Sequence, residues 1–279
     1  MDNLSLELKG PGIVGILGPN GAGKTSLLKL ITGLLFPNSG NLTVNGHSLS
    51  ERREKALSCI GSQIDETRFH PYLSGEEILR FSAQIMGIRD SEVESAVSDA
   101  ARITGSGKFL KQKVGTYSSG MKQRFSIANA IVADPEILIF DEPTANLDPT
   151  GILEFRRVVL KKKEEGKLVI VSSHLLSEIR EMSDRILIMD GGKIVFDSDR
   201  ESSGRYLSVT LEGKSFRMPK NLAGTSELTE SGNKITFRLE NGTSNSDVIR
   251  ELLDMGAKIR EVSESEGLER IYGSRTSRE

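Results

Sequence analysis

The sequence predicts an α/β fold: a mostly parallel sheet, a helical insertion and a small α+β domain after it. Continuous apolar runs at residues 13–17, 137–140 and 168–171 have the length of parallel strands that are covered on both faces. The stretch from Leu73 to about Ala133 is richer in helical signals, and the composition turns polar around residues 197–204. We therefore expect a main domain at 1–200 with a helical subdomain at about 71–133, and an α+β accessory domain at 205–279.

The first elements follow from leucine spacing and turn residues. Residues 4–8 alternate leucine with polar residues and read as a strand, and the glycine-containing turn at 9–12 leads into a second strand at 13–17. Leucine and isoleucine recur with helical spacing from Leu27 to Leu34, so we expect a helix that ends before Pro37. Leu42 and Val44 then resume a strand pattern up to the turn pair Asn45-Gly46.

The later elements follow from apolar runs. Beyond the strands at 137–140 and 168–172, the runs 186–189 and 193–196 flank an Asp-Gly-Gly turn and predict closely paired strands. The small domain is predicted from strand patterns at 207–211, 235–239 and 258–262, a helix at 246–255 and a helix signal at 267–272.

The composition excludes several classes of protein. The 279 residues include 37 basic and 39 acidic side chains, and a net charge of −2 provides no electrostatic basis for nucleic-acid binding. Apolar runs stay shorter than the roughly 18 residues that cross a bilayer. The first residues lack a secretion signal pattern, and the lone Cys59, interpreted as a small buried filler, cannot form an internal disulfide. We expect a reducing compartment.

A glycine-rich segment predicts a phosphate site. Residues 18–25 match the pattern G-x-x-x-x-G-K-[ST] between a strand and a helix, a context that argues against a chance glycine turn. Glycine backbone N–H groups and a helix start favour anions, Lys24 supplies charge to the β and γ phosphates, and Thr25 offers a hydroxyl to Mg²⁺. The predicted ATP contacts are Gly18, Pro19, Asn20, Gly21, Ala22, Gly23, Lys24, Thr25 and Ser26.

Two carboxylates follow the apolar run at 137–140. Asp141 and Glu142 stand where a buried strand emerges, and ligands of open α/β sheets bind at such ends. Metal-assisted phosphoryl transfer needs an acid near Mg²⁺ and a group that orients water. We assign Asp141 to the metal, through water, and Glu142 to the catalytic water; by itself the pair would read as a solvated loop.

A second anion site is predicted at Ser118-Ser119-Gly120, which opens a helix at 121–132. The alternative is an ordinary capped helix. If both phosphate-binding ends serve one nucleotide, they must come from different subunits, so the sequence predicts a two-fold dimer with two ATP molecules at its interface.

The ordered set of motifs resembles the nucleotide-binding subunit of ATP-binding cassette (ABC) transporters over residues 1–200. It comprises the phosphate loop, 117–124, 137–142, 146–148 and His174. The resemblance implies a P-loop NTPase fold of the ABC ATPase type, and ATP hydrolysis with Lys24, Glu142 and His174 as catalytic residues. It also implies ATP contacts from Ser118 and Gly120, although Tyr117, Ser119 and Met121 depart from the usual signature, and from Asp148 in a loop that crosses between subunits.

Two features depart from that family. The 17 residues before Gly18 contain no aromatic residue to stack on adenine. Either the start was assigned too late or the natural protein is truncated; we favour the first, because residues 1–6 align with the middle of a family strand pattern. The usual glutamine after the next strand should fall near Asp65, whereas Gln63 lies two residues earlier. We favour Asp65 as an acidic metal contact, and a register slip to Gln63 remains open.

The resemblance also implies partners. We expect a homodimer, or a heterodimer with a second ABC subunit, and a separate integral membrane permease that docks near the helix at 76–86, unless that helix is only amphipathic core. The tail resembles that of ABC-2 type exporters, which favours export, a dimer-stabilising or regulatory tail, and a cytoplasmic protein peripheral on the cell membrane. The alternatives are a soluble ABC ATPase acting on ribosome or DNA, and a nucleotide-binding regulator with little turnover.

Overall fold

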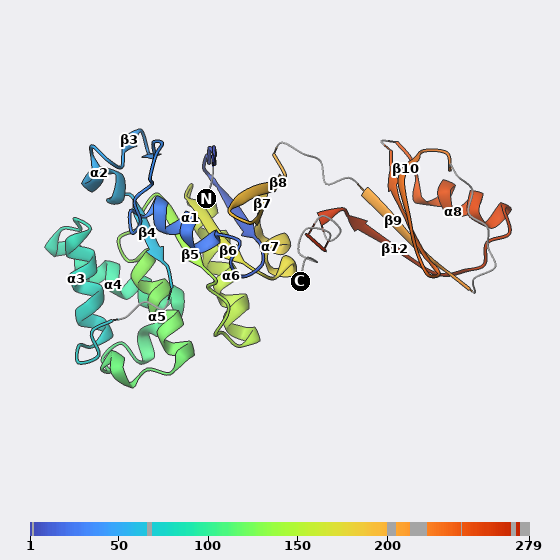
Figure 1. The fold of residues 1–279 in the computed structure, drawn as a ribbon. Helices are drawn as coiled ribbons and strands as arrows, with labels where there is room; N and C mark the ends of the chain where they lie inside the picture. The colour runs from blue at the N-terminus through green and yellow to red at the C-terminus, as the bar shows by residue number, and fades with distance from the viewer. Residues whose placement is uncertain are drawn as a thin grey trace. The chain divides into compact units, whose positions relative to one another are not determined.

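The structure, a computed structural model, describes residues 1, 3–65, 69–199, 205–212, 222–240, 242–268 and 272–273. The chain divides into two compact units, residues 1–197 and residues 198–279, and each is described here by itself (Figure 1). In the described part, no helix combines the length and the apolar character that a membrane crossing requires.

The first unit is built on a six-stranded sheet. Its order is β4 (Ile60–Gln63), β5 (Ile137–Asp141), β6 (Leu168–Ser173), β1 (Gly12–Leu17), β7 (Arg185–Asp190) and β8 (Lys193–Asp197). Neighbouring strands from β4 to β7 run parallel, and β8 pairs antiparallel with β7. The predicted parallel sheet is confirmed, and its strands β1, β5 and β6 are buried along their whole length because both faces are covered.

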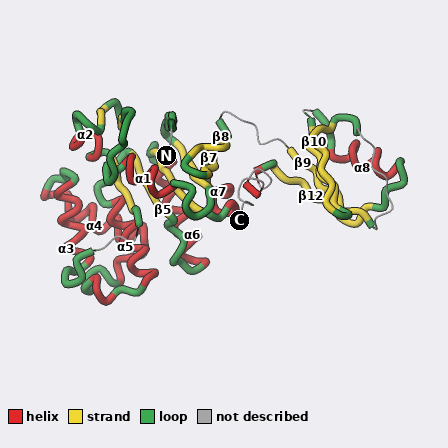
Figure 2. Tube along the Cα trace, viewed as in Figure 1, coloured by secondary structure: helices red, strands yellow, loops and turns green. Residues whose placement is uncertain are grey.

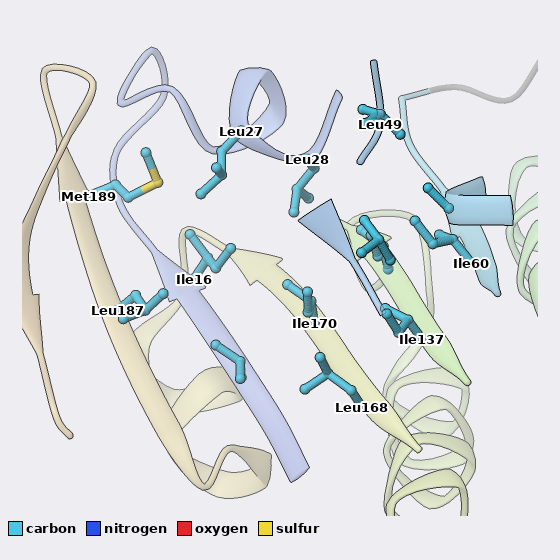
Figure 3. Packing of buried hydrophobic residues seen from close by; sticks show 14 of the residues in the cluster. Ile16, Leu27, Leu28, Leu49, Ile60, Ile137, Leu168, Ile170, Leu187 and Met189 are labelled. Carbon is cyan, nitrogen blue, oxygen red and sulfur yellow. The ribbon is translucent and has the colours of Figure 1, made fainter. Parts of the chain in front are cut away.

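One face of this sheet packs on α1 (Lys24–Ile31). Figure 3 shows Leu27 and Leu28 of the helix above Ile16, Ile170 and other side chains of the strands. The opposite face packs on α6 (Pro149–Glu164) and α7 (Leu176–Met182). There the ring of Phe140 meets that of Phe155 edge-on at 5.2 Å, and fully buried Ile179 sits against β1.

Close approach of α7 depends on a glycine in β1. A Cβ on Gly15 would lie 2.3 Å from Cγ2 of Ile179 and 2.5 Å from Oγ of Ser183. A larger residue would force α7 away from the strand.

A helical layer occupies the region predicted as a helical subdomain (Figure 2). It contains α3 (Gly75–Ile85), α4 (Asp90–Thr104), the 3₁₀ turns η1 (Ser106–Lys108) and η2 (Val114–Thr116), and α5 (Ser119–Ile131). Ser74 and Glu77 form a capping box at the start of α3, and the Ser118 hydroxyl caps α5.

Between α1 and the helical layer lies a short hairpin of β2 (Thr43–Val44) and β3 (His47–Ser48), followed by α2 (Arg53–Leu57). Asn45 and Gly46 have φ of 47° and 75°, the left-handed conformations that a two-residue type I′ turn requires. The predicted strand and its turn pair are confirmed here.

Two predictions about the first forty residues are wrong. The predicted strand at 4–8 does not form, although its three leucines, Leu4, Leu6 and Leu8, pack against the core with alternating burial. An alternating pattern determines which side chains are buried, but a strand also needs a neighbouring strand to share its backbone hydrogen bonds. Helix α1 ends at Ile31 instead of Leu34 because Gly33, with φ of 67°, turns the chain.

The second unit is an α+β fold. Its antiparallel sheet has the order β10 (Thr225–Ser231), β11 (Lys234–Leu239), β9 (Arg205–Leu211) and β12 (Ile259–Glu266). Helix α8 (Asn245–Asp254) packs Val248 and Leu252 on a core that includes Val209 and Phe237. The sequence did not predict β10, whose segment has a single large apolar residue, Leu228. Of the helix signal at 267–272, residues 269–271 lie outside the described residues.

Candidate nucleotide site

The glycine-rich loop joins the carboxyl end of β1 to α1. Gly21 and Gly23 have φ of 80° and 100°, which disfavour any residue with a side chain, and a Cβ on Gly18 would lie 2.5 Å from the carbonyl oxygen of Met189. Gly23 is the N-cap of α1 and supplies no side-chain cap. The first turn of α1 therefore presents backbone N–H groups and the positive end of the helix dipole to an anion.

Lys24 lies inside this loop. It is 5% exposed, and its Nζ donates to the carbonyl oxygens of Gly18, at 2.7 Å, and Pro19, at 3.3 Å. Oε1 of Glu142 is 3.3 Å from the same Nζ. The loop thus holds a positive charge where phosphate oxygens would enter. Of the other predicted contacts, Ala22 is buried, Ser26 lies in α1, and Asn20 is exposed.

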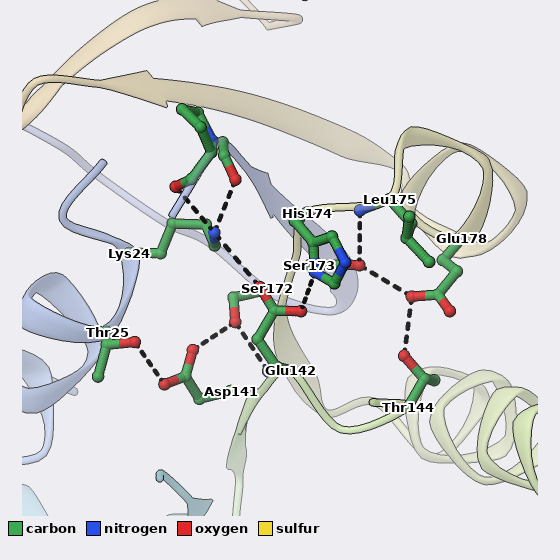
Figure 4. A network of polar contacts seen from close by, with 12 residues as sticks. Lys24, Thr25, Asp141, Glu142, Thr144, Ser172, Ser173, His174, Leu175 and Glu178 are labelled. Atoms are coloured by element: carbon green, nitrogen blue, oxygen red, sulfur yellow. Dashed lines mark hydrogen bonds and ion pairs between the residues drawn. The ribbon is translucent and has the colours of Figure 1, made fainter. Parts of the chain in front are cut away.

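Thr25 and Asp141 are in direct contact although they come from different elements. The Thr25 hydroxyl donates to Oδ2 of Asp141 at 2.7 Å, and the Ser172 hydroxyl donates to the other carboxylate oxygen (Figure 4). The parallel register places Asp141 opposite Ser172 at the ends of β5 and β6. Two of the three predicted metal residues, Thr25 and Asp141, therefore meet at this edge of the sheet.

Gln63 also reaches this point, and Asp65 does not contact it. Gln63 ends β4, is 4% exposed, and its Nε2 donates to the backbone oxygen of Asp141 at 3.3 Å. Its Oε1 is buried without a partner in the described residues. Asp65 instead forms an ion pair with Lys29 of α1, and its side chain is 53% exposed. Of the two alternatives for this loop, the side chain beside Asp141 is Gln63; a metal role of Asp65 stays a prediction.

The oxygen atoms of Thr25, Asp141 and Gln63 are suitable ligands for a hard divalent cation. A hydroxyl, a carboxylate and an amide oxygen are the ligand types that Mg²⁺ accepts, and the unpaired Oε1 of Gln63 is a buried acceptor that a cation or its water would satisfy. No group of three histidine, cysteine or carboxylate side chains suited to a metal occurs in the described ranges. A cation here would take further ligands from phosphate and water.

Glu142 and His174 form the outer part of the site. Oε2 of Glu142 lies 2.8 Å from Nδ1 of His174, and Oε1 faces Lys24. The backbone N–H of Glu142 donates to Ser172 Oγ at 3.0 Å while φ is 47°, a conformation that non-glycine residues rarely adopt. Such strained residues are concentrated at functional sites. Lys24, Glu142 and His174, all predicted as catalytic, are therefore linked side chain to side chain.

Ser118 and Gly120 at the start of α5 lie near the loop that carries Asp148. Ser118 Oγ accepts from the N–H of Met121 at 3.3 Å, and Asp148 caps α6 by accepting from the N–H of Gly151 at 2.9 Å. A Cβ on Gly120 would be 3.7 Å from the carbonyl oxygen of Asn146, so the start of α5 faces the loop that carries Asp148. No contact found among the described residues joins this group to Lys24 or Thr25 of the same chain.

Tyr117 explains one departure from the usual signature. Its ring packs edge-on between Phe109, at 4.9 Å, and Phe125, at 5.7 Å, and its hydroxyl donates to the Phe109 carbonyl at 2.9 Å. Burial raises the pKa of the phenol, which stays neutral near pH 7. Tyr117 is thus an apolar anchor for the start of α5.

The sequence did not predict four polar residues of the site. Besides Ser172, these are Thr144, Ser173 and Glu178, and Figure 4 shows Glu178 joined to both Thr144 and Ser173. The serine pair before His174 is a visible signal, since it ends an apolar strand. Glu178 has no comparable signal, because only the packing of α7 brings it to Thr144.

Comparisons with known proteins agree with this geometry. The family model for the ABC transporter family matches residues 1–145. YdbJ of Bacillus subtilis, an ABC transporter ATP-binding protein, is 39% identical over 70% of the chain, and BcrA of Bacillus licheniformis, a bacitracin transport ATP-binding protein, is 37% identical over 76%. The chain spans 62% of the length of YdbJ and 70% of that of BcrA.

Solved structures are similar as well. The ATP-binding subunit of an ABC transporter superposes with a TM-score of 0.63 and 28% identity, over 67% of this chain and 78% of that chain. A bacterial ABC transporter cassette described as dimeric superposes with a TM-score of 0.64 over 69% of this chain and 87% of that chain; at 23% identity it supports the fold alone.

Proposed function

The chain belongs to the ABC transporter family of ATP-binding proteins, and from this premise we propose that it hydrolyses ATP with Mg²⁺ to power transport through a separate membrane subunit. One observation carries the proposal. Five side chains from β1–α1, β5 and β6 are linked by contacts of 3.3 Å or less at one edge of the sheet. They are Lys24, Thr25, Asp141, Glu142 and His174, with Ser172 between the strands.

The phosphate loop binds the triphosphate in this proposal. Lys24 exchanges its bonds to the carbonyls of Gly18 and Pro19 for phosphate oxygens, and the N–H groups at the start of α1 bind the remaining charge. Thr25, Asp141 and Gln63 would hold Mg²⁺, Asp141 through water. An ion held there would supply positive charge that offsets the charge of the triphosphate.

Glu142 orients the attacking water and accepts its proton. Its carboxylate is held between Lys24 and His174, so it has little freedom to turn away. His174 contacts the γ phosphate and keeps Glu142 in place. General bases of this kind contribute about 10²–10⁴-fold to rates.

A second copy completes the site. Ser118 and Gly120 open α5 and Asp148 caps α6, so each helix start is suited to phosphate, and no contact among the described residues joins them to Lys24 of the same chain. We propose that two copies, or this chain and a second ABC subunit, close head to tail over two ATP molecules. A cassette that is similar to this chain in fold is itself described as dimeric.

The membrane partner docks on the helical layer. Tyr72, Phe81 and Ile85 are 74%, 64% and 67% exposed although they are large and apolar. Relatives named for bacitracin and lantibiotic transport support a transport role. We propose export, a peripheral position on the cytoplasmic face of the membrane, and cargo selection by the permease.

Glu142→Gln tests the proposal. We expect the variant to hydrolyse ATP at least about 100-fold more slowly than the wild type because it lacks the base, while it still binds ATP. ATP-saturated Glu142→Gln should sediment as a dimer. Glu164→Gln, an exposed change on α6, is the control and should leave the rate unchanged. Wild-type protein that does not hydrolyse ATP would refute the proposal.

A further inference from the structure

Two loops carry the outer part of the site. The loop after β5 contains Glu142 and Thr144, whereas Ser173 is the last residue of β6 and His174 begins the loop after it. Glu142 and His174 meet at 2.8 Å, so a shift of about 1 Å between the loops would separate them. The parallel ladder between β5 and β6 ends at Asp141 and Ser172, one residue before this pair on one strand and two on the other.

Beyond the ladder, Glu178 joins the two loops. Its Oε2 accepts one hydrogen bond from Thr144 Oγ1 and one from Ser173 Oγ, both at 2.8 Å (Figure 4). Ser173 Oγ also accepts from the N–H of Leu175 at 3.0 Å, so its own proton is available to Glu178. Thr144 and Ser173 are 7% and 1% exposed, which makes both contacts shielded from water.

The element that carries Glu178 is firmly placed. Glu178 lies in the first turn of α7, where a carboxylate interacts favourably with the helix dipole. The next residue, Ile179, is fully buried against Gly15 of β1. The carboxylate is therefore fixed relative to the strand that leads into the phosphate loop.

We propose that Glu178 is a positioning residue for ATP hydrolysis. By holding Thr144 and Ser173 on one oxygen, it fixes the spacing of the two loops so that His174 meets Glu142 in the reactive arrangement. It acts through these residues and touches neither nucleotide nor water. This inference rests on the hydrolysis proposed above.

Hydrolysis and binding measured separately test the role. Glu178→Ala should lower kcat at least about tenfold and leave the ATP Kd and KM within about twofold, because the phosphate loop is untouched. Glu178→Gln keeps a carbonyl oxygen that can accept both bonds and should stay within about threefold of wild type. Glu181→Ala is the matched control: it lies on the same helix and its carboxylate pairs with Arg156 on the surface.

Measuring Glu178→Ala in a His174→Ala variant distinguishes positioning of the His174–Glu142 pair from a general structural role of Glu178. In His174→Ala, where the pair is already lost, Glu178→Ala should lower the residual rate less than about twofold further. If Glu178→Ala fails to fold, Thr144→Val, which removes one donor and keeps the shape, should lower kcat with an unchanged ATP Kd.

The inference is overturned if Glu178→Ala, or Thr144→Val in its place, has the wild-type kcat. It is also overturned if the effects of Glu178→Ala and His174→Ala multiply, or if Glu178→Gln is as slow as Glu178→Ala. Absence of hydrolysis by the wild type would instead refute the proposed function, so the two failures are distinguishable.

Discussion

Gln63 and Asp65 are two residues apart and have different surroundings. Gln63 is buried at the end of β4 beside Asp141, whereas Asp65, with φ of 55°, turns toward Lys29 on α1. A free carboxylate binds metal ions more strongly than an amide does, but the carboxylate of Asp65 is already paired with the ammonium group of Lys29. The unpaired amide oxygen of Gln63 is therefore better placed than the Asp65 carboxylate to be a metal ligand beside Asp141.

Replacing each residue distinguishes the two. Gln63→Leu should raise the Mg²⁺ concentration that gives half-maximal ATP hydrolysis about fivefold or more, since one oxygen near the ion is lost. Asp65→Asn should leave it within about twofold. Titration of Mg²⁺ at saturating ATP measures both, and the opposite ranking would restore Asp65 as the metal contact.

Asp134 forms a charged cluster away from the site, with Lys162 at 2.7 Å and Lys167 at 2.9 Å. Burial alone would raise the pKa of Asp134, but hydrogen bonds from Lys162 and Lys167 outweigh it and hold the pKa below its usual value. A depressed pKa stabilises the folded state above the unfolded-state pKa of about 4, and that stabilisation is lost as the pH falls through the folded-state pKa.

Asp134→Asn should therefore lower the urea midpoint at pH 7, and its midpoint should converge on that of the wild type as the pH falls below the unfolded-state pKa of about 4. Asparagine tolerates the left-handed conformation of this position, φ of 48°, so the change removes the charge and keeps the backbone. Urea unfolding at several pH values measures the difference. If the difference in urea midpoint between the variant and the wild type grew as the pH fell, the charge of Asp134 would not be the cause of that difference.

Among the elements, α5 combines two roles at its start. The Ser118 hydroxyl caps the helix, and the same turn is the proposed contact with the partner's triphosphate. The two roles respond differently to charge, because an N-cap accepts Ser or Asp equally well whereas a phosphate contact does not.

Ser118→Asp should keep the helix cap, with Tm within about 2 °C of wild type, while repulsion from phosphate prevents ATP-driven dimerisation and lowers hydrolysis at least about tenfold. Sedimentation with ATP and a melting curve measure the two effects. Ser244→Asp at the start of α8 is the control and should leave hydrolysis unchanged. A Ser118→Asp protein that dimerises normally would place Ser118 away from the nucleotide.

At the scale of the whole molecule, each unit has its own core. Every residue of the nucleotide site belongs to residues 1–197, and the second unit packs a separate cluster around Val209, Phe237 and Leu252. We therefore expect the phosphate loop to form without the second unit, whose contribution is expected at assembly.

Deleting residues 205–279 should leave the ATP Kd within about twofold of wild type and weaken ATP-driven dimerisation. Equilibrium binding and sedimentation of the shortened chain, with circular dichroism to confirm that it is folded, measure this. Loss of ATP binding in a folded shortened chain would contradict the independence of the first unit.

The sequence by itself determined the local features of this protein. Runs of apolar residues specify the buried parallel strands. The positive φ values of Gly21 and Gly23 belong to a loop that favours glycine. The pairs Lys24-Thr25 and Asp141-Glu142 come soon after the strands that place them at the phosphate site. These signals lie within a few neighbouring residues, so spacing and residue type suffice to read them.

Tertiary structure alone decided which distant residues meet. Leucine alternation at 4–8 could not reveal that no strand pairs there, and no pattern distinguished Gln63 from Asp65 until β4 was placed beside β5. Thr144, Ser173 and Glu178 are brought together by the packing of α7 on β1. Hydrogen-bond partners in separate segments depend on strand register and on packing. Neither can be predicted from local patterns in a single sequence, because both are set by contacts between residues that are far apart in the chain.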